Sequence, residues 1–273
     1  MNFTKITIII NHKSNYFIGS QIRGALGYAL KQVVCINPSY KCEGCFAVEN
    51  CLYFDFYEKK NSFHQYRLDF ELGKPFYEFN LYLFEDAIQQ LPYVVSAIYK
   101  LLTEIGLSYK KTTFKNFSIF VNDENILDNN KLTLPSSIVK QFVIDKFCQN
   151  IILHFVTPLR IKKENRFIRD ENITLQDIVN SIYQRQMQLL GRGFKKFPYE
   201  IEGEIVKKEL YYKELTRKSN RQKTTMHLGG IMGEIILQNI NKEVYEVLKL
   251  GELIGVGKST VFGLGKIEIK EIK

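Results

Sequence analysis

The pattern of apolar residues predicts the same order of strands and helices twice along the chain, and this repetition limits the fold more than any other feature. In the first half, β-branched or alternating runs predict strands, and apolar residues at helical spacing predict helices. The predicted elements are a strand over residues 5–10, a helix over 20–34 with Ser20 as its N-cap, a strand over 76–84, a helix over 92–105 with Pro92 in its first turn and Gly106 at its end, and a strand over 114–121. The polar stretch 122–131 predicts a loop.

The second half repeats this order with different residues. Thr174 is the expected N-cap of a helix that runs to about Leu190, and Asp177 forms a near capping box with it. The other predicted elements are strands over residues 151–156, 209–215, 227–237 and 262–269, and a helix over 242–254. Two successive βαββαβ units predict an α+β fold of two tandem ferredoxin-like domains. We place these domains at residues 1–146 and 147–273.

Positive charge is concentrated in the second half. The chain of 273 residues has a net charge of +9; residues 147–273 hold 22 Lys and Arg against 15 Asp and Glu, and residues 1–146 hold the remaining 16 against 14. Such an excess is typical of a face that binds a polyanion, although lysine-rich surfaces also serve solubility alone. No apolar run approaches the roughly 20 residues that span a bilayer, and we find no secretion signal. We therefore expect a cytoplasmic protein without a membrane partner.

A glycine-rich segment near the C-terminus is the most informative motif. Residues 255–265 read Gly-Val-Gly-Lys-Ser-Thr-Val-Phe-Gly-Leu-Gly. Glycines at this density allow positive φ and close approach to a ligand, and amides beside Lys258 suit a phosphate. A nucleotide-binding P-loop is excluded, because that motif needs a glycine where Glu252 stands and a helix where the residues after Ser259 predict a strand. A glycine-rich hairpin that closes a sheet is the alternative interpretation.

Three further segments accompany this motif. Residues 216–223 form a basic run, Thr-Arg-Lys-Ser-Asn-Arg-Gln-Lys, that leads into Met-His-Leu-Gly-Gly-Ile-Met-Gly-Glu at 226–234. Residues 155–160 read Phe-Val-Thr-Pro-Leu-Arg, and residues 23–27 read Arg-Gly-Ala-Leu-Gly. Together with the glycine segment, these stretches resemble the CRISPR-associated guide-RNA-processing endoribonucleases of the repeat-associated mysterious protein superfamily. Residues 23–27, which a cysteine cluster follows, look like the first helix of one subgroup.

The resemblance implies ferredoxin-like domains and metal-independent cleavage of precursor CRISPR RNA within its repeats. In that reaction the ribose 2′-OH attacks the adjacent phosphate and leaves a 2′,3′-cyclic phosphate and a 5′-OH, so that DNA is not a substrate. The residues expected to bind RNA lie in the second half: Arg160, Arg217, Lys218, Arg221, Lys223, Gly255, Gly257, Lys258, Gly263 and Gly265.

Such chemistry needs a general base, a proton donor and a cation near the phosphate. The family commonly uses a histidine that Tyr or Lys supports. His64, in a polar stretch after the cysteine cluster, is the first candidate, and His227, beside the basic segment, is the second. His154 lies in a predicted strand and His12 in a predicted loop before the first helix. A loop histidine without a catalytic role is the alternative interpretation for each.

Four of the five cysteines form a cluster, at Cys35, Cys42, Cys45 and Cys51. This spacing predicts a tetrahedral metal site with a structural role, since four thiolates leave no open position for chemistry. Zinc is the expected metal, and an iron–sulfur cluster is the alternative. Disulfides are the poorer interpretation in a cytosolic chain, and Cys148 is expected to be a buried apolar residue.

The sequence leaves three functions open. The first is the guide-RNA-processing endoribonuclease; the second is a non-catalytic RNA-binding subunit of a CRISPR effector complex on the same fold. The third is a zinc-dependent regulator whose cysteine site contacts nucleic acid. The expected partner is CRISPR repeat RNA, while other effector subunits and a homodimer stay open.

Overall fold

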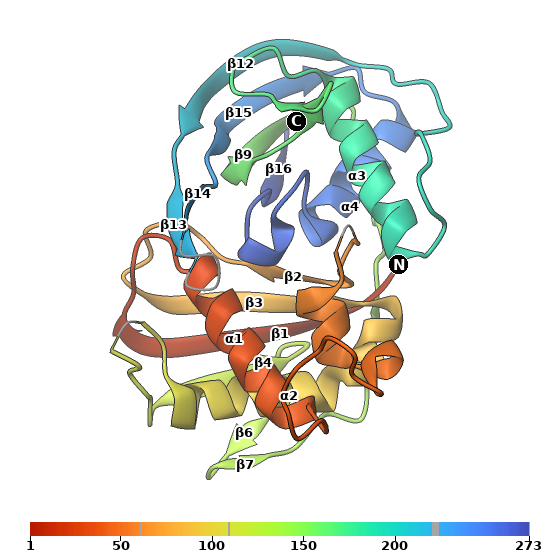
Figure 1. Ribbon diagram of the computed structural model, residues 1–273. Coiled ribbons are helices and arrows are strands. Elements are labelled where there is room, and N and C mark those ends of the chain that lie inside the picture. Colours follow the sequence, from red (N-terminus) through yellow and green to blue (C-terminus); the bar gives the residue numbers. More distant parts are fainter. Residues whose placement is uncertain (61, 109, 220–223, 273) are drawn as a thin grey trace. The chain divides into compact units, whose positions relative to one another are not determined.

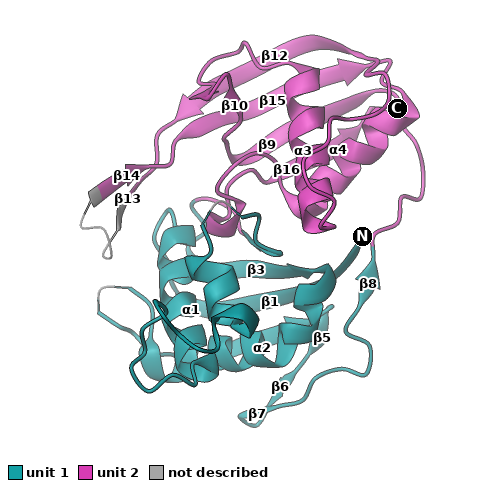
Figure 2. Cartoon of the chain, turned by 45° about the vertical axis from the view of Figure 1, so that its right-hand side comes forward, with its two compact units in different colours: residues 1–68, 73–141 teal, residues 69–72, 142–273 magenta. Residues whose placement is uncertain are grey.

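The computed structural model describes residues 1–60, 62–108, 110–219 and 224–272, and the chain divides into two compact units. Unit 1 comprises residues 1–68 and 73–141, and unit 2 comprises residues 69–72 and 142–273 (Figure 2). The division falls between Gln141 and Phe142, whereas the sequence places it after Lys146. The short segment 69–72 also groups with unit 2, although it lies between two parts of unit 1 in the sequence.

Unit 1 is a sheet with two helices packed against it. Its main elements are β1 (Asn2–Lys13), α1 (Gly19–Val34), β2 (Tyr66–Asp69), β3 (Phe76–Phe84), α2 (Leu91–Lys100) and β4 (Phe117–Val121) (Figure 1). The strands lie in the order β2-β3-β1-β4, and β1 is antiparallel to both of its neighbours. Alternate residues of β1, Ile6, Ile8 and Ile10, are at most 1% exposed and face the helices. The unit therefore has the predicted βαββαβ order.

Local signals set the ends of the helices in unit 1, with one exception. Pro92 lies in the first turn of α2, and the helix continues as a π-helical turn, η4 (Leu101–Ile105), until Gly106 at φ 78°. A Cβ on Gly106 would collide with the backbone of Lys111, so only glycine fits this end. The prediction of Ser20 as N-cap is wrong: α1 starts one residue earlier, at Gly19, and no side chain caps it. Ser20 lies inside the helix and therefore does not stand at the N-cap position.

Unit 2 repeats the same topology. Its main elements are β9 (Ile151–Leu159), α3 (Leu175–Leu189), β12 (Glu204–Lys213), β15 (Gly230–Gln238), α4 (Lys242–Ile254) and β16 (Ile267–Glu271), in the strand order β12-β15-β9-β16. The pairs within this sheet are antiparallel, and α3 and α4 lie side by side against it (Figure 2). The two units thus have equivalent strand orders, which is the arrangement of two tandem ferredoxin-like domains.

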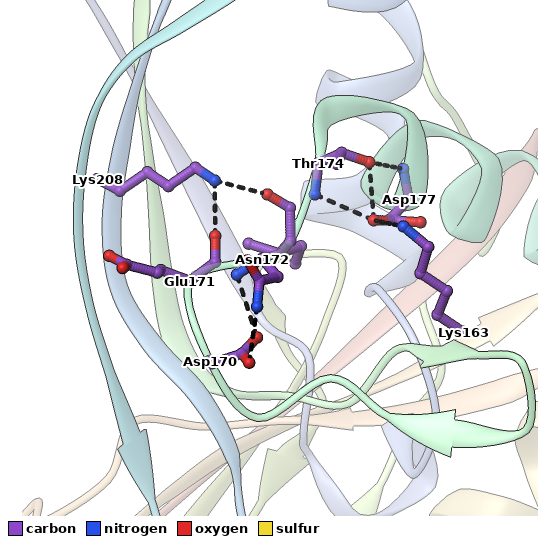
Figure 3. Close-up of polar contacts among 8 residues, drawn as sticks. Lys163, Asp170, Glu171, Asn172, Thr174, Asp177 and Lys208 are labelled. Atoms are coloured by element: carbon purple, nitrogen blue, oxygen red, sulfur yellow. Dashed lines mark hydrogen bonds and ion pairs between the residues drawn. The ribbon is translucent and has the colours of Figure 1, made fainter.

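The start of α3 shows how sequence fixes an element in unit 2 (Figure 3). The amide of Asp177 donates to the Thr174 hydroxyl at 3.1 Å, and the Thr174 amide donates to the Asp177 carboxylate at 3.0 Å, which completes the predicted capping box. Lys208 of β12 donates to the carbonyl of Glu171 at 2.6 Å and to that of Ile173 at 3.0 Å. These bonds fasten the segment before α3 to the edge strand.

Two predicted strands of unit 2 are shorter than expected. His227 does not belong to β15; it ends a separate hairpin of β13 (Thr216–Ser219) and β14 (Thr224–His227). Leu228 and Gly229 separate the two strands, and a Cβ on Gly229 would lie 2.7 Å from the Tyr212 hydroxyl and 2.9 Å from the Lys213 carbonyl oxygen. Residues 260–262 form a 3-10 turn, η5 (Thr260–Phe262), and the last strand begins at Ile267 because glycines at positive φ interrupt the segment before it.

The remaining elements are short. In unit 1, the predicted loop 122–131 contains short strands: β5 (Glu124–Asn125), β6 (Leu127–Asp128) and β7 (Lys131–Leu132). The last of these, β7, ends one residue after the predicted loop. The other short elements are β8 (Lys140–Gln141), β10 (Lys162–Lys163), β11 (Arg166–Phe167), η1 (Val48–Asn50), η2 (Phe54–Glu58) and η3 (Glu85–Gln90). Within the described residues, no helix has the length and apolar character needed to cross a membrane.

Candidate nucleic-acid interface

The glycine segment 255–265 connects α4 to β16 in unit 2. Four of its glycines, Gly255, Gly257, Gly263 and Gly265, have φ between 73° and 78°. Gly257 lies against Arg160, because a Cβ there would be 2.5 Å from the Arg160 carbonyl oxygen. A Cβ on Gly263 would collide with the Phe70 ring, and one on Gly265 with the Val256 carbonyl. Close packing inside unit 2 therefore explains these glycines without a ligand.

Most amides of the glycine segment are already hydrogen-bonded within the protein. Val256 donates to Gly265 at 2.9 Å and Lys258 donates to Arg160 at 2.8 Å. The Gly257 amide donates to the Ser181 hydroxyl of α3 at 3.0 Å. In the described residues, only the amides of 259–261 within this segment have no acceptor. The predicted phosphate cradle is thus limited to the part of the segment around Lys258.

Arg160, a predicted RNA ligand, is built into the fold at the end of β9. Its side chain and backbone together are only 8% exposed, and its Nη1 donates to the Gly229 carbonyl at 2.5 Å. The guanidinium lies 4.2 Å from the centroid of the Phe167 ring. Burial lowers the pKa of Arg160, while Tyr212 and Glu214 counteract this effect. Arg160 therefore has a packing role in the fold, and its contact with RNA stays a prediction.

The basic segment forms the hairpin β13–β14, which extends from the sheet of unit 2 (Figure 2). Arg217 packs its guanidinium 4.5 Å from the ring centroid of Phe262 in the glycine segment and 2.9 Å from the Met226 sulfur. Lys218 pairs with Thr225 in the backbone ladder. The predicted ligands Arg221 and Lys223 lie outside the described residues. Arg217 therefore joins the hairpin to the glycine segment.

Lys258 lies beside two cationic residues that the sequence did not single out. Burial lowers the pKa of Lys258, and the positive charges of Lys162 and Arg185 lower it further. Lys162 comes from β10 and Arg185 from α3, so the positive charges that act on Lys258 come from two separate elements. No local pattern could have found this group, because its members are far apart in the chain.

His64, the first catalytic candidate, lies next to a group of aromatic and basic side chains in unit 1. Its Nδ1 is 2.8 Å from the carbonyl oxygen of Asp55 in η2, and its ring centroid is 5.9 Å from that of Tyr66. A carbonyl can only accept a hydrogen bond, so Nδ1 carries a proton in this arrangement. In neutral His64 the lone pair is then on Nε2, as a general base requires.

Arg23 of α1 brings a positive charge to this group. Its guanidinium lies 4.7 Å from the Tyr57 ring centroid, and its Nη2 donates to the Phe56 carbonyl at 3.5 Å. Burial raises the pKa of Tyr57 well above its ordinary value, and Tyr66 raises it further, while Arg23 opposes the shift. Tyr57 is thus a phenol that keeps its proton, and its ring lies 6.2 Å from that of Tyr66, the neighbour of His64.

The other histidines have different surroundings. His227, the second candidate, lies at the base of the hairpin with Nδ1 3.3 Å from the Glu214 carboxylate, and its side chain is 70% exposed. His12 lies near the end of β1 rather than in the predicted loop, and its ring packs 5.2 Å from that of Phe114. His154 lies in β9, as predicted, opposite Glu234 and Glu268 on the neighbouring strands.

The cysteine cluster lies in the segment after α1. The Cys45 amide donates to the Cys42 carbonyl at 3.3 Å, which forms a turn between these two residues. Burial raises the pKa of the Cys42 thiol, Lys31 opposes this, and Glu58 and Cys51 add to it. Across the described ranges, however, no three His, Cys, Asp or Glu side chains are grouped closely enough to hold a metal ion. The fit to zinc is therefore incomplete in this arrangement, and the metal stays a prediction.

Comparison with known proteins assigns a family to the second unit. Residues 153–267 match the family model of the CRISPR-associated endoribonuclease Cas6, and residues 11–138 match a model described as an N-terminal domain. A protein of Archaeoglobus fulgidus described as uncharacterized is 23% identical over 285 residues, which covers 93% of this chain and 92% of that protein.

Solved structures match the chain over both units. A Cas6 product complex aligns with a TM-score of 0.58 at 14% identity, covering 99% of this chain and 100% of that one. The Cas6-bearing chain of a partial Cas6-RT-Cas1–Cas2 complex aligns with a TM-score of 0.54 at 14% identity, covering 99% of this chain and 46% of that one. At these identities the likeness shows the fold, and it confirms the two ferredoxin-like domains.

Proposed function

We propose that the chain is a member of the CRISPR-associated endoribonuclease Cas6 family and that it cleaves precursor CRISPR RNA within the repeats. The match of residues 153–267 to the Cas6 model carries this proposal. The similar Cas6 structure is a product complex, which supports RNA processing as the shared activity. The excess of Lys and Arg over Asp and Glu in residues 147–273 suits a polyanionic substrate.

We propose that the reaction is an internal transfer at phosphorus that needs no metal ion. The 2′-oxygen attacks the adjacent phosphorus while a base takes its proton, and the 5′-oxygen leaves with a proton from an acid. The products are a 2′,3′-cyclic phosphate and a 5′-OH, and the balance needs no added reactant. Two positioned proton-transfer groups contribute about 10²- to 10⁴-fold each in such reactions.

His64 is the first choice for the general base. Its bond to the Asp55 carbonyl fixes the proton on Nδ1, so in the neutral ring Nε2 is the nitrogen that would accept the proton of the 2′-OH. Arg23, through Tyr57 and the Phe56 carbonyl, supplies positive charge in the same group of side chains. A nearby cation favours the charge that develops on phosphate oxygens in the transition state.

His227 is the second choice. The Glu214 carboxylate accepts a hydrogen bond from Nδ1 when that nitrogen carries the proton, which orients the ring and leaves the lone pair on Nε2. His227 also lies next to the hairpin of Arg217 and Lys218, where we expect the RNA backbone to bind. We propose Arg221 and Lys223 as further phosphate contacts of this hairpin from their sequence alone.

The partners follow from the same family. We propose CRISPR repeat RNA as the substrate and a cytoplasmic location, and we retain other CRISPR proteins as assembly partners. The similar chain in the Cas6-RT-Cas1–Cas2 complex supports the last of these, since a Cas6 domain functions there beside other Cas proteins. A homodimer is testable by light scattering of the purified protein.

One incubation tests the function. The purified protein is mixed with labelled repeat RNA in EDTA, and the products are separated at single-nucleotide resolution. Cleavage at one position with a 2′,3′-cyclic phosphate end supports the proposal. Tight binding without cleavage assigns the protein instead to the non-catalytic RNA-binding subunits, and neither binding nor cleavage rejects both functions.

Variants of the two histidines test their roles. Under single-turnover conditions, loss of the general base in His64→Ala slows cleavage about 10²- to 10⁴-fold while RNA affinity stays the same. His227→Ala tests the second candidate in the same assay. His12→Ala is the matched control, because the His12 ring packs against Phe114 and is not a catalytic candidate. A His64→Ala protein that cleaves at the wild-type rate rules out His64.

A further inference from the structure

The connection between α3 and β12 in unit 2 contains aromatic and basic side chains in close succession. Residues 192–199 read Arg-Gly-Phe-Lys-Lys-Phe-Pro-Tyr, which places three cations and three rings in one short stretch without a carboxylate. The stretch belongs to no helix or strand, and all of its residues except Phe197 are exposed. We call residues 192–199 the aromatic-basic segment; it contains neither catalytic candidate and no part of the glycine segment.

The half-buried ring of Phe197 holds the aromatic-basic segment against α3. The Phe197 amide donates to the side-chain oxygen of Asn180 at 3.2 Å, and the Phe197 ring lies 5.4 Å from that of Tyr183, edge to face at 76°. At the other end of the segment, the Arg192 amide donates to the Met187 carbonyl at 2.8 Å. The segment therefore runs back along α3 from the C-terminal end of that helix (Figure 1).

Tyr199 extends this packing to the surface. Its ring centroid lies 5.5 Å from that of Phe197, at 69°, yet Tyr199 is 60% exposed. Pro198 stands between the two, and a proline fixes its own φ and restricts the residue before it. Just beyond, the Glu200 carbonyl accepts a hydrogen bond from the Asn241 side chain at 2.9 Å. The protein thus holds the Tyr199 ring in place while most of that ring stays open to solvent.

The cations of the segment have no counter-charge. Arg192, Lys195 and Lys196 are exposed, and none of them forms an ion pair with another residue that the structure describes. Consecutive Cα atoms are about 3.8 Å apart, so the Cα atoms of both lysines lie within about 8 Å of the Cα of Phe197. Two uncompensated ammonium groups therefore stand next to the packed rings.

Exposed rings among cations are the combination with which proteins bind single-stranded nucleic acid. Bases stack on the rings, while Lys and Arg contact the phosphates. A protein partner fits less well, because lysine is depleted in protein–protein interfaces. Phe194, at 68% exposure, and Tyr199 stand on either side of the two lysines in the chain. Glu200 and Glu202 follow Tyr199 and repel phosphates, so they limit the site at that end.

We propose that the aromatic-basic segment binds unpaired nucleotides of RNA. One base stacks on the Tyr199 ring, which Phe197 supports, and a second base stacks on Phe194. Lys195 and Lys196 contact the phosphates that join these nucleotides. The inference rests on the proposed function, because it takes RNA as the ligand, and it adds a site for a single-stranded part of the precursor. Every base has a face that can stack, so the site adds affinity without reading sequence.

A fluorescent reporter tests the site. The chain contains no tryptophan, so Tyr199→Trp places the only indole of the protein in the aromatic-basic segment. The probe is an oligouridine of about ten nucleotides, within the range that single-stranded binding sites cover. A base that stacks on the indole quenches its emission, so the signal reports this site even while RNA binds elsewhere. We expect saturable quenching by oligouridine and none by inorganic polyphosphate, which carries charge without bases.

Further changes in the Tyr199→Trp protein measure the parts of the site. Phe194→Ala weakens the affinity seen by quenching about 5- to 150-fold, the range for loss of one stacked base. Replacing Lys195 and Lys196 together by alanine lowers the slope of log affinity against log salt by about 1.4, the value for two phosphates of a single strand. Circular dichroism of each variant checks the fold.

The control reporter is Tyr93→Trp in α2. Tyr93 is 50% exposed, and its neighbours in the chain include no cation. Oligouridine therefore leaves the emission of this variant unchanged. Equal quenching of both reporters means that the signal does not come from the aromatic-basic segment, and it overturns the site.

The outcomes separate the site from the enzyme, since cleavage of repeat RNA is measured on the wild-type protein. Cleavage without quenching of Tyr199→Trp overturns the site and leaves the proposed function intact. Quenching that Phe194→Ala weakens, without cleavage, supports the site and contradicts the enzyme. Equal quenching by polyphosphate overturns base stacking. If Phe194→Ala changes the oligomeric state in light scattering but not the quenching, the segment is a protein interface and the site is overturned. Neither quenching nor cleavage overturns both.

Discussion

Replacing Gly257 by alanine tests whether the glycine segment is held by packing against Arg160. Gly257 has φ 77°, and a Cβ would lie 2.5 Å from the Arg160 carbonyl oxygen and 2.8 Å from its carbon. Both atoms belong to backbone, which cannot rotate away as a side chain can. To relieve the contact, residue 257 must separate from Arg160.

The cost follows from two sources. A left-handed conformation costs a residue with a Cβ about 1–2 kcal/mol. Separation also weakens the bonds from Lys258 to Arg160 and from Gly257 to Ser181, at about 1 kcal/mol each. We therefore expect Gly257→Ala to lower the free energy of unfolding by about 3–4 kcal/mol. Gly191→Ala is the matched control, since Gly191 has φ 67° with nothing within 4 Å of an added Cβ.

Urea unfolding followed by far-ultraviolet circular dichroism measures both variants. Gly191→Ala bears the conformational cost alone, about 1–2 kcal/mol, so the difference between the two variants isolates the contact with Arg160. If the two variants differ by less than about 0.5 kcal/mol, the typical scatter of surface substitutions, the segment yields easily and the packing argument fails.

Three further predictions use separate parts of the chain. Thr174→Ala removes the capping box of α3 and should lower the free energy of unfolding in urea by about 1 kcal/mol. Ser20→Ala in α1 is the control and should change stability little, because Ser20 does not cap its helix. Equal losses in the two variants contradict the capping argument. Elemental analysis of the purified protein should give about one zinc per chain. Cys42→Ser should impair folding, because structural zinc contributes on the order of 10 kcal/mol. A colourless protein without metal after anaerobic purification refutes the metal site, and a brown protein indicates an iron–sulfur cluster. The pKa of Lys258 in the folded state lies below its ordinary value of 10.5, so the charged form of Lys258 destabilises the folded state. Lys258→Met should therefore have a higher free energy of unfolding than wild type near neutral pH, and this difference should disappear above the ordinary pKa. A difference that stays constant across alkaline pH contradicts the shift.

Local signals in the sequence account for most of the fold. The bounds of β3 and α4 agree with the predicted ranges because strand alternation and helical spacing are strong there. Thr174 with Asp177 also marks the start of α3, as a capping box should. The prediction of Ser20 as the N-cap of α1 is wrong, because a serine near the start of a helix caps it only when the residue stands just outside the helix.

Tertiary contacts decided the parts that the sequence left unresolved. Where residues 227–237 predict one strand, Leu228 and Gly229 lie between the hairpin and β15, and a Cβ on Gly229 would collide with Tyr212 and with the Lys213 carbonyl. The Thr-Pro motif predicts Arg160 as an RNA ligand, but no local pattern predicts that its guanidinium stacks on the ring of Phe167; its contact with RNA stays a prediction. Lys162 and Arg185 have no motif of their own, and only the fold brings them to Lys258.

The site was predictable only in outline. The glycine segment and the basic hairpin were recognisable from their residues, but the hydrogen bonds that occupy most of the segment's amides depend on β9 and α3. His64 could be chosen as a candidate from the sequence. Its tautomer could not, since the Asp55 carbonyl that fixes it belongs to the π-helical turn η2.

The measurement that tests the central claim most directly is cleavage of repeat RNA with a single 2′-deoxy nucleotide at the cleavage position. If the ribose 2′-OH is the nucleophile, the protein binds this RNA with wild-type affinity and leaves it intact, while unmodified RNA yields a 2′,3′-cyclic phosphate end in EDTA. Cleavage of the deoxy-substituted RNA at the same position contradicts the account, because its nucleophile is then not the ribose.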